Sequence, residues 1–219
     1  MSSEVFDKFI SLLQDELSRK LPGQPAHLEM FPVTRSIALS KTNGDKSPKP
    51  SAVLVLFFPK NDRVKFALVK RANYPGVHSG QIALPGGQYE LTDQDVASTA
   101  LRETKEEIGI DPKKVQLLGG LTPLYIPPSN FDVFPFVGSY PENQPFKIDA
   151  VEIDQILEID LDDLMKAVNK TNKIIQHRTG IQISVPCFYL NGEIVWGATA
   201  MILNELRKLI EKGWSALNV

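Results

Sequence analysis

Three glutamates, Glu103, Glu106 and Glu107, are spaced so that a helix would place all of them on one face. At about 100° per residue, their side chains fall within an arc of roughly 100°. Like charges one turn apart repel each other by roughly 0.2–0.5 kcal/mol, and Gly109 indicates a helix end, where the dipole disfavours anions. A solvated acidic face would account for an isolated pair of glutamates, but this setting predicts a bound cation.

A glycine-rich loop precedes the acidic segment. Gly86 and Gly87 can adopt backbone angles closed to other residues and can bring main-chain carbonyls close to a ligand. Carbonyl and carboxylate oxygens suit Mg²⁺ or Mn²⁺, so the loop and the glutamates together predict a divalent-metal site for phosphate chemistry. Thr92, with Asp95 three residues later, resembles a capping box, and we therefore expect the helix to begin near Asp93.

The segment 87–110 resembles the Nudix box of the Nudix hydrolases. That pattern is Gly, five residues, Glu, seven residues, then Arg-Glu-U-x-Glu-Glu-x-Gly-U, where U is aliphatic, and the second half matches from Arg102 to Ile110 except at Thr104. The first half departs, because Asp93 replaces the glutamate and eight residues, not seven, separate it from Arg102. This one-residue expansion resembles the coenzyme A pyrophosphatase branch of the family.

Segments outside the box support the same branch. Arg71-Ala72 and the run 78–87 are similar to the extra motif that those enzymes carry upstream of the box. The chain differs from that motif at Leu84, in place of phenylalanine, at Gly76, in place of arginine, and in the preceding strand. The missing arginine could have contacted a phosphate or the carboxylates. Further similarity occurs at 124–129, 151–152 and 196–200, so the resemblance spans roughly residues 50–210.

The resemblance implies an α/β fold, a Nudix-type α/β/α sandwich with a mixed β-sheet in which the box forms loop, helix and loop. Glu103 and Glu107, one turn apart, can hold the same ion, and we assign Glu106 as a third ligand. The carbonyl of Gly87 is a further candidate ligand. The cofactor is therefore expected to be Mg²⁺ or Mn²⁺.

Two roles around the glutamates stay open in the sequence. Arg102 can hold Glu106 or reach Asp93, or it can form an ordinary surface ion pair. The general base is either Glu152, which matches a glutamate that the family places near the metals, or Glu103. The residue types alone do not choose between these two carboxylates.

Candidate substrate contacts are Arg71 for phosphate charge, His78 for a polar group, and the loop residues Gly86 and Gly87. Arg71 and His78 could equally be structural. The expected reaction is the hydrolysis of coenzyme A or an acyl derivative to a phosphopantetheine fragment and adenosine 3′,5′-bisphosphate. ADP-ribose or a dinucleotide is the alternative substrate, which Gly76 keeps open. A non-catalytic nucleotide-binding module is a third hypothesis, disfavoured by the retention of all three glutamates.

Composition agrees with an enzyme that acts on a small molecule. The chain has 219 residues, enough for a substantial core, and its net charge of −2 gives no electrostatic basis for binding nucleic acid. Cys187 is the single cysteine, which we expect to be a small buried residue and not a catalytic thiol. Neither a secretory signal nor a membrane span is apparent, so we expect a cytoplasmic protein without membrane association. A homodimer is compatible with the sequence.

Hydrophobic patterning predicts the elements that position the site. An amphipathic helix is expected over 3–20, within an N-terminal segment 1–22 that packs on a single domain over 23–219. Residues 21–50 are expected to be an irregular connection. Strands are expected at 51–58 and 64–71, joined as a hairpin, and at 115–125, 133–137, 151–159, 188–190 and 193–195, the last two flanking the turn Asn191-Gly192. With helices over 162–168 and 198–212, this order predicts a mixed sheet between helices.

Overall fold

The computed structural model describes residues 3–31, 47–72, 80–142, 145–176, 180 and 182–217. The first half of the chain contains α1 (Ser3–Leu17), α2 (Gln24–Leu28), β1 (Lys49–Lys60), β2 (Arg63–Arg71), β3 (Ile82–Ala83), β4 (Gly86–Gln88) and α4 (Val96–Ile108). The second half contains η1 (Pro112–Lys114), β5 (Gln116–Gly120), β6 (Leu124–Ile126), β7 (Phe131–Ser139), β8 (Ile153–Asp160), α5 (Leu161–Met165), η2 (Ala167–Asn169), β9 (Lys170–Gln176), β10 (Gln182–Leu190), β11 (Glu193–Trp196) and α6 (Gly197–Leu217).

Strand β1 lies at the centre of an eight-stranded mixed sheet. It runs parallel to β7 and antiparallel to its other neighbours, but it changes neighbour along its length. Residues 57–60 of β1 pair with β2, whereas residues 51–53 pair with β4. The far end of β2 pairs with β3 and β8 instead. The sheet therefore opens between β4 and the end of β2, and the glutamates of α4 lie at this opening.

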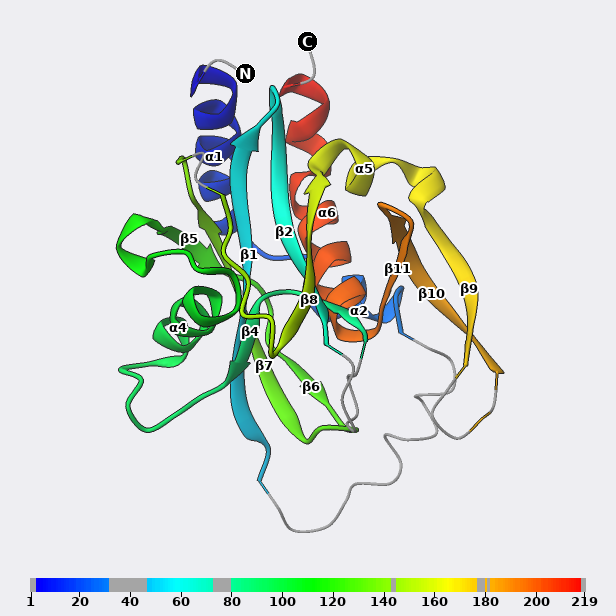
Figure 1. The fold of residues 1–219 in the computed structure, drawn as a ribbon. Helices are drawn as coiled ribbons and strands as arrows, with labels where there is room; N and C mark the ends of the chain where they lie inside the picture. Colours follow the sequence, from blue (N-terminus) through cyan, green and yellow to red (C-terminus); the bar gives the residue numbers. More distant parts are fainter. Residues whose placement is uncertain are drawn as a thin grey trace.

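Alternating side chains of β1 point to the two faces of the sheet, as expected for a strand buried on both sides. Leu54, Leu56 and Phe58 pack with Ala100 and Ile108 of α4. The alternate residues Val55 and Phe57 belong to a second core cluster that contains residues of α1 and α6. Figure 1 shows α4 on one side of the sheet and the pair α1 and α6 on the other, which gives an α/β/α sandwich.

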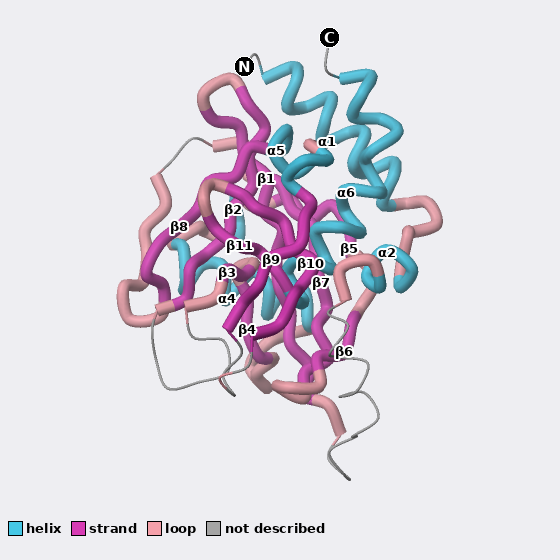
Figure 2. The backbone as a smooth tube through the Cα atoms, turned by 90° about the vertical axis from the view of Figure 1, so that its right-hand side faces the viewer, coloured by secondary structure: helices cyan, strands magenta, loops and turns pink. Residues whose placement is uncertain are grey.

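Aromatic contacts join α1 to α6 and to the sheet. The Phe9 ring lies 5.0 Å from that of Phe57 and 5.7 Å from that of Trp214, both edge-on. Phe9 and Leu13 are fully buried, and the burial of each such side chain stabilises the fold by about 1.5–3 kcal/mol. Figure 2 shows α1 and α6 side by side.

No helix in the described ranges combines the length and the apolar character needed to cross a lipid bilayer.

A second, three-stranded sheet of β9, β10 and β11 follows in the chain. The hairpin predicted at Asn191-Gly192 is present between β10 and β11, with both residues at positive φ. Cys187 is fully buried in β10, as expected. Strand β9 was not predicted, because Lys170–Gln176 shows no clear alternation and most of its side chains are exposed.

Several predicted boundaries need correction. The segment 115–125 contains two short strands instead of one, β5 and β6, which both pair with β7. Strand β8 begins only at Ile153, and the helix expected over 162–168 is the short α5 followed by a 3₁₀ turn. The connection 21–50 contains the helix α2, which begins with Pro25 in its first turn. Helix α1 ends at Leu17, while the hairpin between β1 and β2 turns tightly at Asn61 and Asp62.

Candidate active site

Helix α4 presents the glutamates, and its two ends are fixed by local capping. Asp95 is the N-cap: its side chain accepts a hydrogen bond from the Ser98 amide at 2.7 Å, and the Ser98 hydroxyl accepts one from the Asp95 amide. The predicted cap at Thr92 and helix start near Asp93 are therefore wrong, because Asp95 is the cap and the helix begins at Val96. Gly109 ends the helix in the left-handed conformation at φ 75°, as predicted.

The glycine loop and the glutamates are in direct contact. A Cβ atom on Gly87 would lie 2.4 Å from the carboxylate carbon of Glu103, so a larger residue would displace this carboxylate from its present position. A Cβ atom on Gly86 would lie 2.2 Å from the Ala52 carbonyl oxygen, because β4 crosses β1 closely here. The loop backbone therefore lies against the Glu103 carboxylate at Gly87 and against β1 at Gly86.

Glu107 is the most buried of the three glutamates, with 1% of its surface exposed. The Gly86 amide donates a hydrogen bond to its Oε2 at 3.0 Å, and Nη1 of Arg71 lies 3.6 Å from its Oε1. Burial raises the pKa of Glu107 to about 7, although the Gly86 amide and Arg71 act in the opposite direction. Burial also raises the pKa of Glu103. Both carboxylates would therefore be stabilised by additional positive charge.

Arg102 organises the other side of the cluster. Its Nε and Nη2 donate to the two carboxylate oxygens of Asp93 at 2.8 and 3.1 Å, and its Nη1 donates to Glu103 and Glu106, each at 2.9 Å. The hydrogen bond from Arg102 is the main reason that the pKa of Asp93 is well below its usual range. Arg102 thus both holds Glu106 and reaches Asp93, and its side chain is only 22% exposed. The number of these bonds and the low exposure of Arg102 distinguish it from an arginine in an ordinary surface ion pair.

Further hydrogen bonds to Asp93 and Arg102 were not predicted from the sequence. The Thr99 hydroxyl and the Glu90 amide donate to Asp93 at 2.9 and 3.0 Å, and Arg102 Nη2 donates to the Gln88 carbonyl at 3.1 Å. Thr99 follows Asp95 by four residues and faces inward on α4. This position is the one feature of the sequence that could have indicated its bond to Asp93. The contacts of the loop backbone have no such signal.

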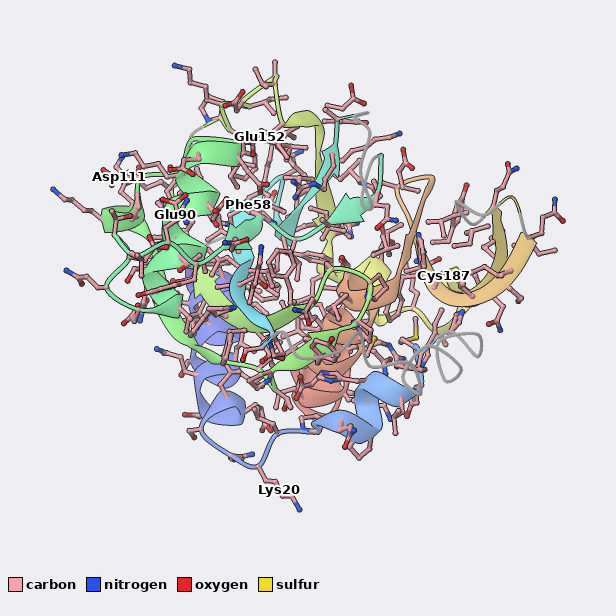
Figure 3. The ribbon with its side chains drawn as sticks, turned by 90° about the horizontal axis from the view of Figure 1, so that it is seen from below. Lys20, Phe58, Glu90, Asp111, Glu152 and Cys187 are labelled. Carbon is pink, nitrogen blue, oxygen red and sulfur yellow. The ribbon has the colours of Figure 1, made fainter. Side chains whose placement is uncertain are left out.

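Glu152 lies in the turn before β8, next to the box glutamates. Its charge contributes to raising the pKa of both Glu103 and Glu107, as a smaller factor than burial. Figure 3 labels Glu152 beside α4, whereas Cys187 lies on the opposite side of the molecule. The Ala72 amide donates to the Glu152 carbonyl at 2.8 Å, which joins this turn to the end of β2. Arg71 therefore comes to the glutamates from the end of β2, and Glu152 comes from the turn before β8.

His78, a candidate substrate contact, and Gly76 lie outside the described residues. Gly86 and Gly87, by contrast, contribute backbone groups directly at the glutamates. All of the candidate residues that the structure describes lie around the glycine loop before α4 and the acidic face of that helix.

The donor set suits a hard divalent cation. Within the described part of the chain, no three Asp, Glu, His or Cys side chains are already gathered as a metal site. Arg102 Nη1 donates to both Glu103 and Glu106 here. Glu103 and Glu107 nevertheless provide carboxylate oxygens beside the glycine loop. Burial raises the pKa of both groups, so a cation bound there would stabilise their charged forms. Oxygen donors without nitrogen or sulfur favour Mg²⁺ or Mn²⁺.

Comparison with known proteins agrees with this arrangement. The NUDIX domain profile matches residues 48–178, which is more than half of the chain. The chain therefore belongs to the Nudix family, as a hydrolase of phosphoanhydride bonds in nucleoside-diphosphate-linked compounds, and the predicted family and enzyme class are confirmed.

Its relatives include the uncharacterized Nudix hydrolases NudL of Yersinia pestis (strain Pestoides F) and Yersinia pseudotuberculosis serotype O:1b (strain IP 31758). Each is 31% identical over 210 residues, covering 96% of this chain and 99% of the relative. The MutT protein from Methanosarcina mazei Go1 has a similar fold, with a TM-score of 0.50 and 15% identity over 78% of this chain and 99% of its own. The predicted α/β fold with a mixed sheet is confirmed.

Proposed function

We propose that this Nudix hydrolase cleaves the diphosphate of coenzyme A or an acyl-coenzyme A, giving a phosphopantetheine fragment and adenosine 3′,5′-bisphosphate. The observation that carries this proposal is the position of Arg71, the first residue of the upstream motif, with its Nη1 3.6 Å from the buried Glu107. A residue of the coenzyme A-type motif and the box glutamates thus share one site. The box also keeps the one-residue expansion of that branch.

Glu103, Glu107 and Glu106 are the proposed ligands for Mg²⁺ or Mn²⁺, with the Gly87 carbonyl completing the set. When bound, such an ion would neutralise phosphate oxygens and lower the pKa of the attacking water. Arg71 is suited to a phosphate oxygen, because its Nε is buried and has no hydrogen-bond partner among the described residues. Arg102, which is itself bonded to Asp93, donates hydrogen bonds that hold Glu103 and Glu106 in place.

The reaction needs a carboxylate to accept a proton. As the oxygen of water bonds to phosphorus, its proton passes to this base, the P–O bond of the diphosphate breaks, and the leaving phosphate keeps the electron pair. We propose Glu152 as the base, with Glu103 as the alternative. Glu152 is exposed and, among the residues that the structure describes, has no cation partner of the kind that Arg102 provides for Glu103, so it is better suited to receive a proton from solvent-derived water.

A panel of substrates tests the proposal. Purified protein is incubated with coenzyme A, ADP-ribose or a dinucleoside polyphosphate, each with Mg²⁺, with Mn²⁺ or with a chelator, and the products are separated by chromatography. We expect coenzyme A to be hydrolysed with a kcat/KM at least about tenfold above the others, and only with metal.

The other outcomes identify the competing functions. Preferred turnover of ADP-ribose or a dinucleotide would replace the proposed substrate. Gly76 keeps this alternative open, because the arginine of the coenzyme A motif is missing there. Binding of a nucleotide without turnover under every metal condition would instead indicate a non-catalytic module.

A further inference from the structure

The segment before β8 is attached to the C-terminal end of the box helix. Carbonyl groups in the last turn of a helix lack partners within the helix. Here the Lys147 amide donates to the Ile108 carbonyl at 3.0 Å, and the Asp149 amide donates to the Glu107 carbonyl at 3.2 Å. Gly109 makes this approach possible, because a Cβ atom there would lie 2.8 Å from the Lys147 Cβ.

Asp149 also shapes the turn that carries Glu152. Its side-chain Oδ1 accepts a hydrogen bond from the Val151 amide at 2.9 Å, as in an Asx turn. Its carbonyl accepts hydrogen bonds from the amides of Glu152 and Ile153 at 3.2 and 2.9 Å. Asp149, which accepts all three of these bonds, is exposed, so its side chain is not needed to fill the core.

These bonds close a ring around the site. From Asp149 the turn leads to Glu152, whose carbonyl accepts from the Ala72 amide. The neighbouring Arg71 contacts the Glu107 carboxylate, and the Glu107 carbonyl accepts from the Asp149 amide. Loss of the Asp149 side-chain bond therefore acts on the turn that carries Glu152, while the bond from the Asp149 amide to the Glu107 carbonyl uses backbone atoms alone.

We propose that Asp149 is a positioning residue, whose side chain fixes the turn that holds the Glu152 carboxylate beside Glu103 and Glu107. This inference rests on the proposed function, because it concerns the geometry of the proposed base. Loss of the Asx turn leaves Glu152 on a loosened backbone, so proton transfer slows while substrate binding stays the same.

The test compares Asp149→Ala with Asp149→Asn, which keeps a side-chain oxygen as acceptor. Asp154→Ala removes a nearby exposed carboxylate and serves as the charge control. In the coenzyme A assay with Mg²⁺, we expect Asp149→Ala to lower kcat about 10- to 100-fold with KM within about twofold. Asp149→Asn and Asp154→Ala should stay within about threefold of the wild type.

Two further measurements separate positioning from general damage. The double variant Asp149→Ala/Glu152→Gln should be no slower than Glu152→Gln alone, because a displaced base and a missing base are equivalent. Hydrogen exchange of the metal-free full chain should show faster exchange of the Val151 and Glu152 amides in Asp149→Ala only. If Asp149→Ala does not fold, Asp149→Leu, which also lacks a side-chain acceptor but is close to Asn in size, takes its place beside Asp149→Asn.

Unchanged kcat in Asp149→Ala, or a fully additive double variant, would overturn the inference while the proposed function stands. A wild-type protein that hydrolyses no member of the substrate panel would overturn the proposed function, and the catalytic role of Asp149 with it. Unchanged exchange at Val151 in Asp149→Ala would show that the Asx turn does not hold this segment.

Discussion

Glu107 combines burial with negative charge, and this combination should be measurable without substrate. Because burial raises its pKa from 4.5 to about 7, the folded protein binds more protons than the unfolded chain between these pH values. The free energy of unfolding contributed by this group is therefore highest below about pH 4.5 and falls as the pH rises toward about 7. Bound metal should remove this loss of stability.

Glu107→Gln should abolish turnover and stabilise the metal-free protein by on the order of 1–3 kcal/mol above about pH 7. The amide keeps the volume of the side chain and can still accept from Gly86, but it carries no charge to bury. Denaturant unfolding in chelator across this pH range measures the effect. Glu106→Gln is the control, because Glu106 is exposed and its neutralisation should give no such gain. Wild-type turnover in Glu107→Gln would contradict the assignment of Glu107 as a metal ligand.

Gly87 is predicted to control the position of Glu103 more than the stability of the fold. In Gly87→Ala the new Cβ would lie within 2.4–2.5 Å of all three carboxylate atoms of Glu103. This carboxylate is the far end of a flexible side chain and can move, so we expect a loss of kcat of about tenfold or more with a small change in Tm. Gly120→Ala, where a Cβ would make only ordinary contacts, should leave kcat unchanged. Equal kcat values for the two variants would show that Glu103 needs no fixed position.

At the scale of elements, α4 shows which features a sequence pattern can specify. The shared face of Glu103, Glu106 and Glu107 requires only helical periodicity and was predicted, as was the end at Gly109. The start was not, because Thr92 and Asp95 both suit a cap and both have a polar residue three positions later. The choice depends on Asp93, whose carboxylate is bound by Arg102 and Thr99 and is therefore held outside the helix.

The cap can be tested directly by comparing Asp95→Ala with Thr92→Ala. Asp95→Ala removes the acceptor for the Ser98 amide, so it should lower Tm by about 2–4 °C, as expected for a lost cap in a chain of this size. Thr92→Ala should leave Tm within about 1 °C. Thermal unfolding followed by circular dichroism measures both. The reverse order of the two effects would restore the start predicted from the sequence.

Other elements depend on partners that are distant in the sequence. Strand β9 exists because its residues pair with Gln182–Phe188 of β10, and Lys170–Gln176 alone carries no strand pattern. Glu152 reaches the glutamates only through the Asp149 turn and the bond to Ala72. The box, the mixed sheet, the two layers of helices and the hairpin of β10 and β11 could thus be predicted, whereas β9 and the support of Glu152 could not.

At the scale of the whole molecule, the two faces of the sheet have different tasks. Helix α4 presents the proposed metal ligands on one face, and α6 packs against the other face. Glu205 of α6 is fully buried and accepts hydrogen bonds from the amides of Gly23 and Thr122 at 2.9 and 3.1 Å and from the Thr122 hydroxyl at 2.6 Å. His27 Nε2 lies 2.8 Å from its Oε2. One carboxylate therefore joins α2, α6 and the connection between β5 and β6.

Glu205→Gln should separate stability from catalysis. Burial acts to raise the pKa of Glu205, but the bonds from His27 and Thr122 outweigh it and hold the pKa below 4.5. A depressed pKa stabilises the fold above the unfolded value of 4.5, and this stabilisation is lost as the pH falls through the folded value. We expect Glu205→Gln to lower the free energy of unfolding by about 2–4 kcal/mol near neutral pH, and by less in acid.

The kcat of the folded Glu205→Gln variant should equal that of the wild type, since Glu205 lies across the sheet from α4. Urea unfolding at several pH values and initial rates at low temperature provide the two measurements. Glu211→Gln, which alters a half-exposed carboxylate on the same helix, is the control and should change neither. A folded Glu205→Gln protein with a large loss of kcat would show that the sheet transmits strain from α6 to the box glutamates, and the two faces would then form one functional unit.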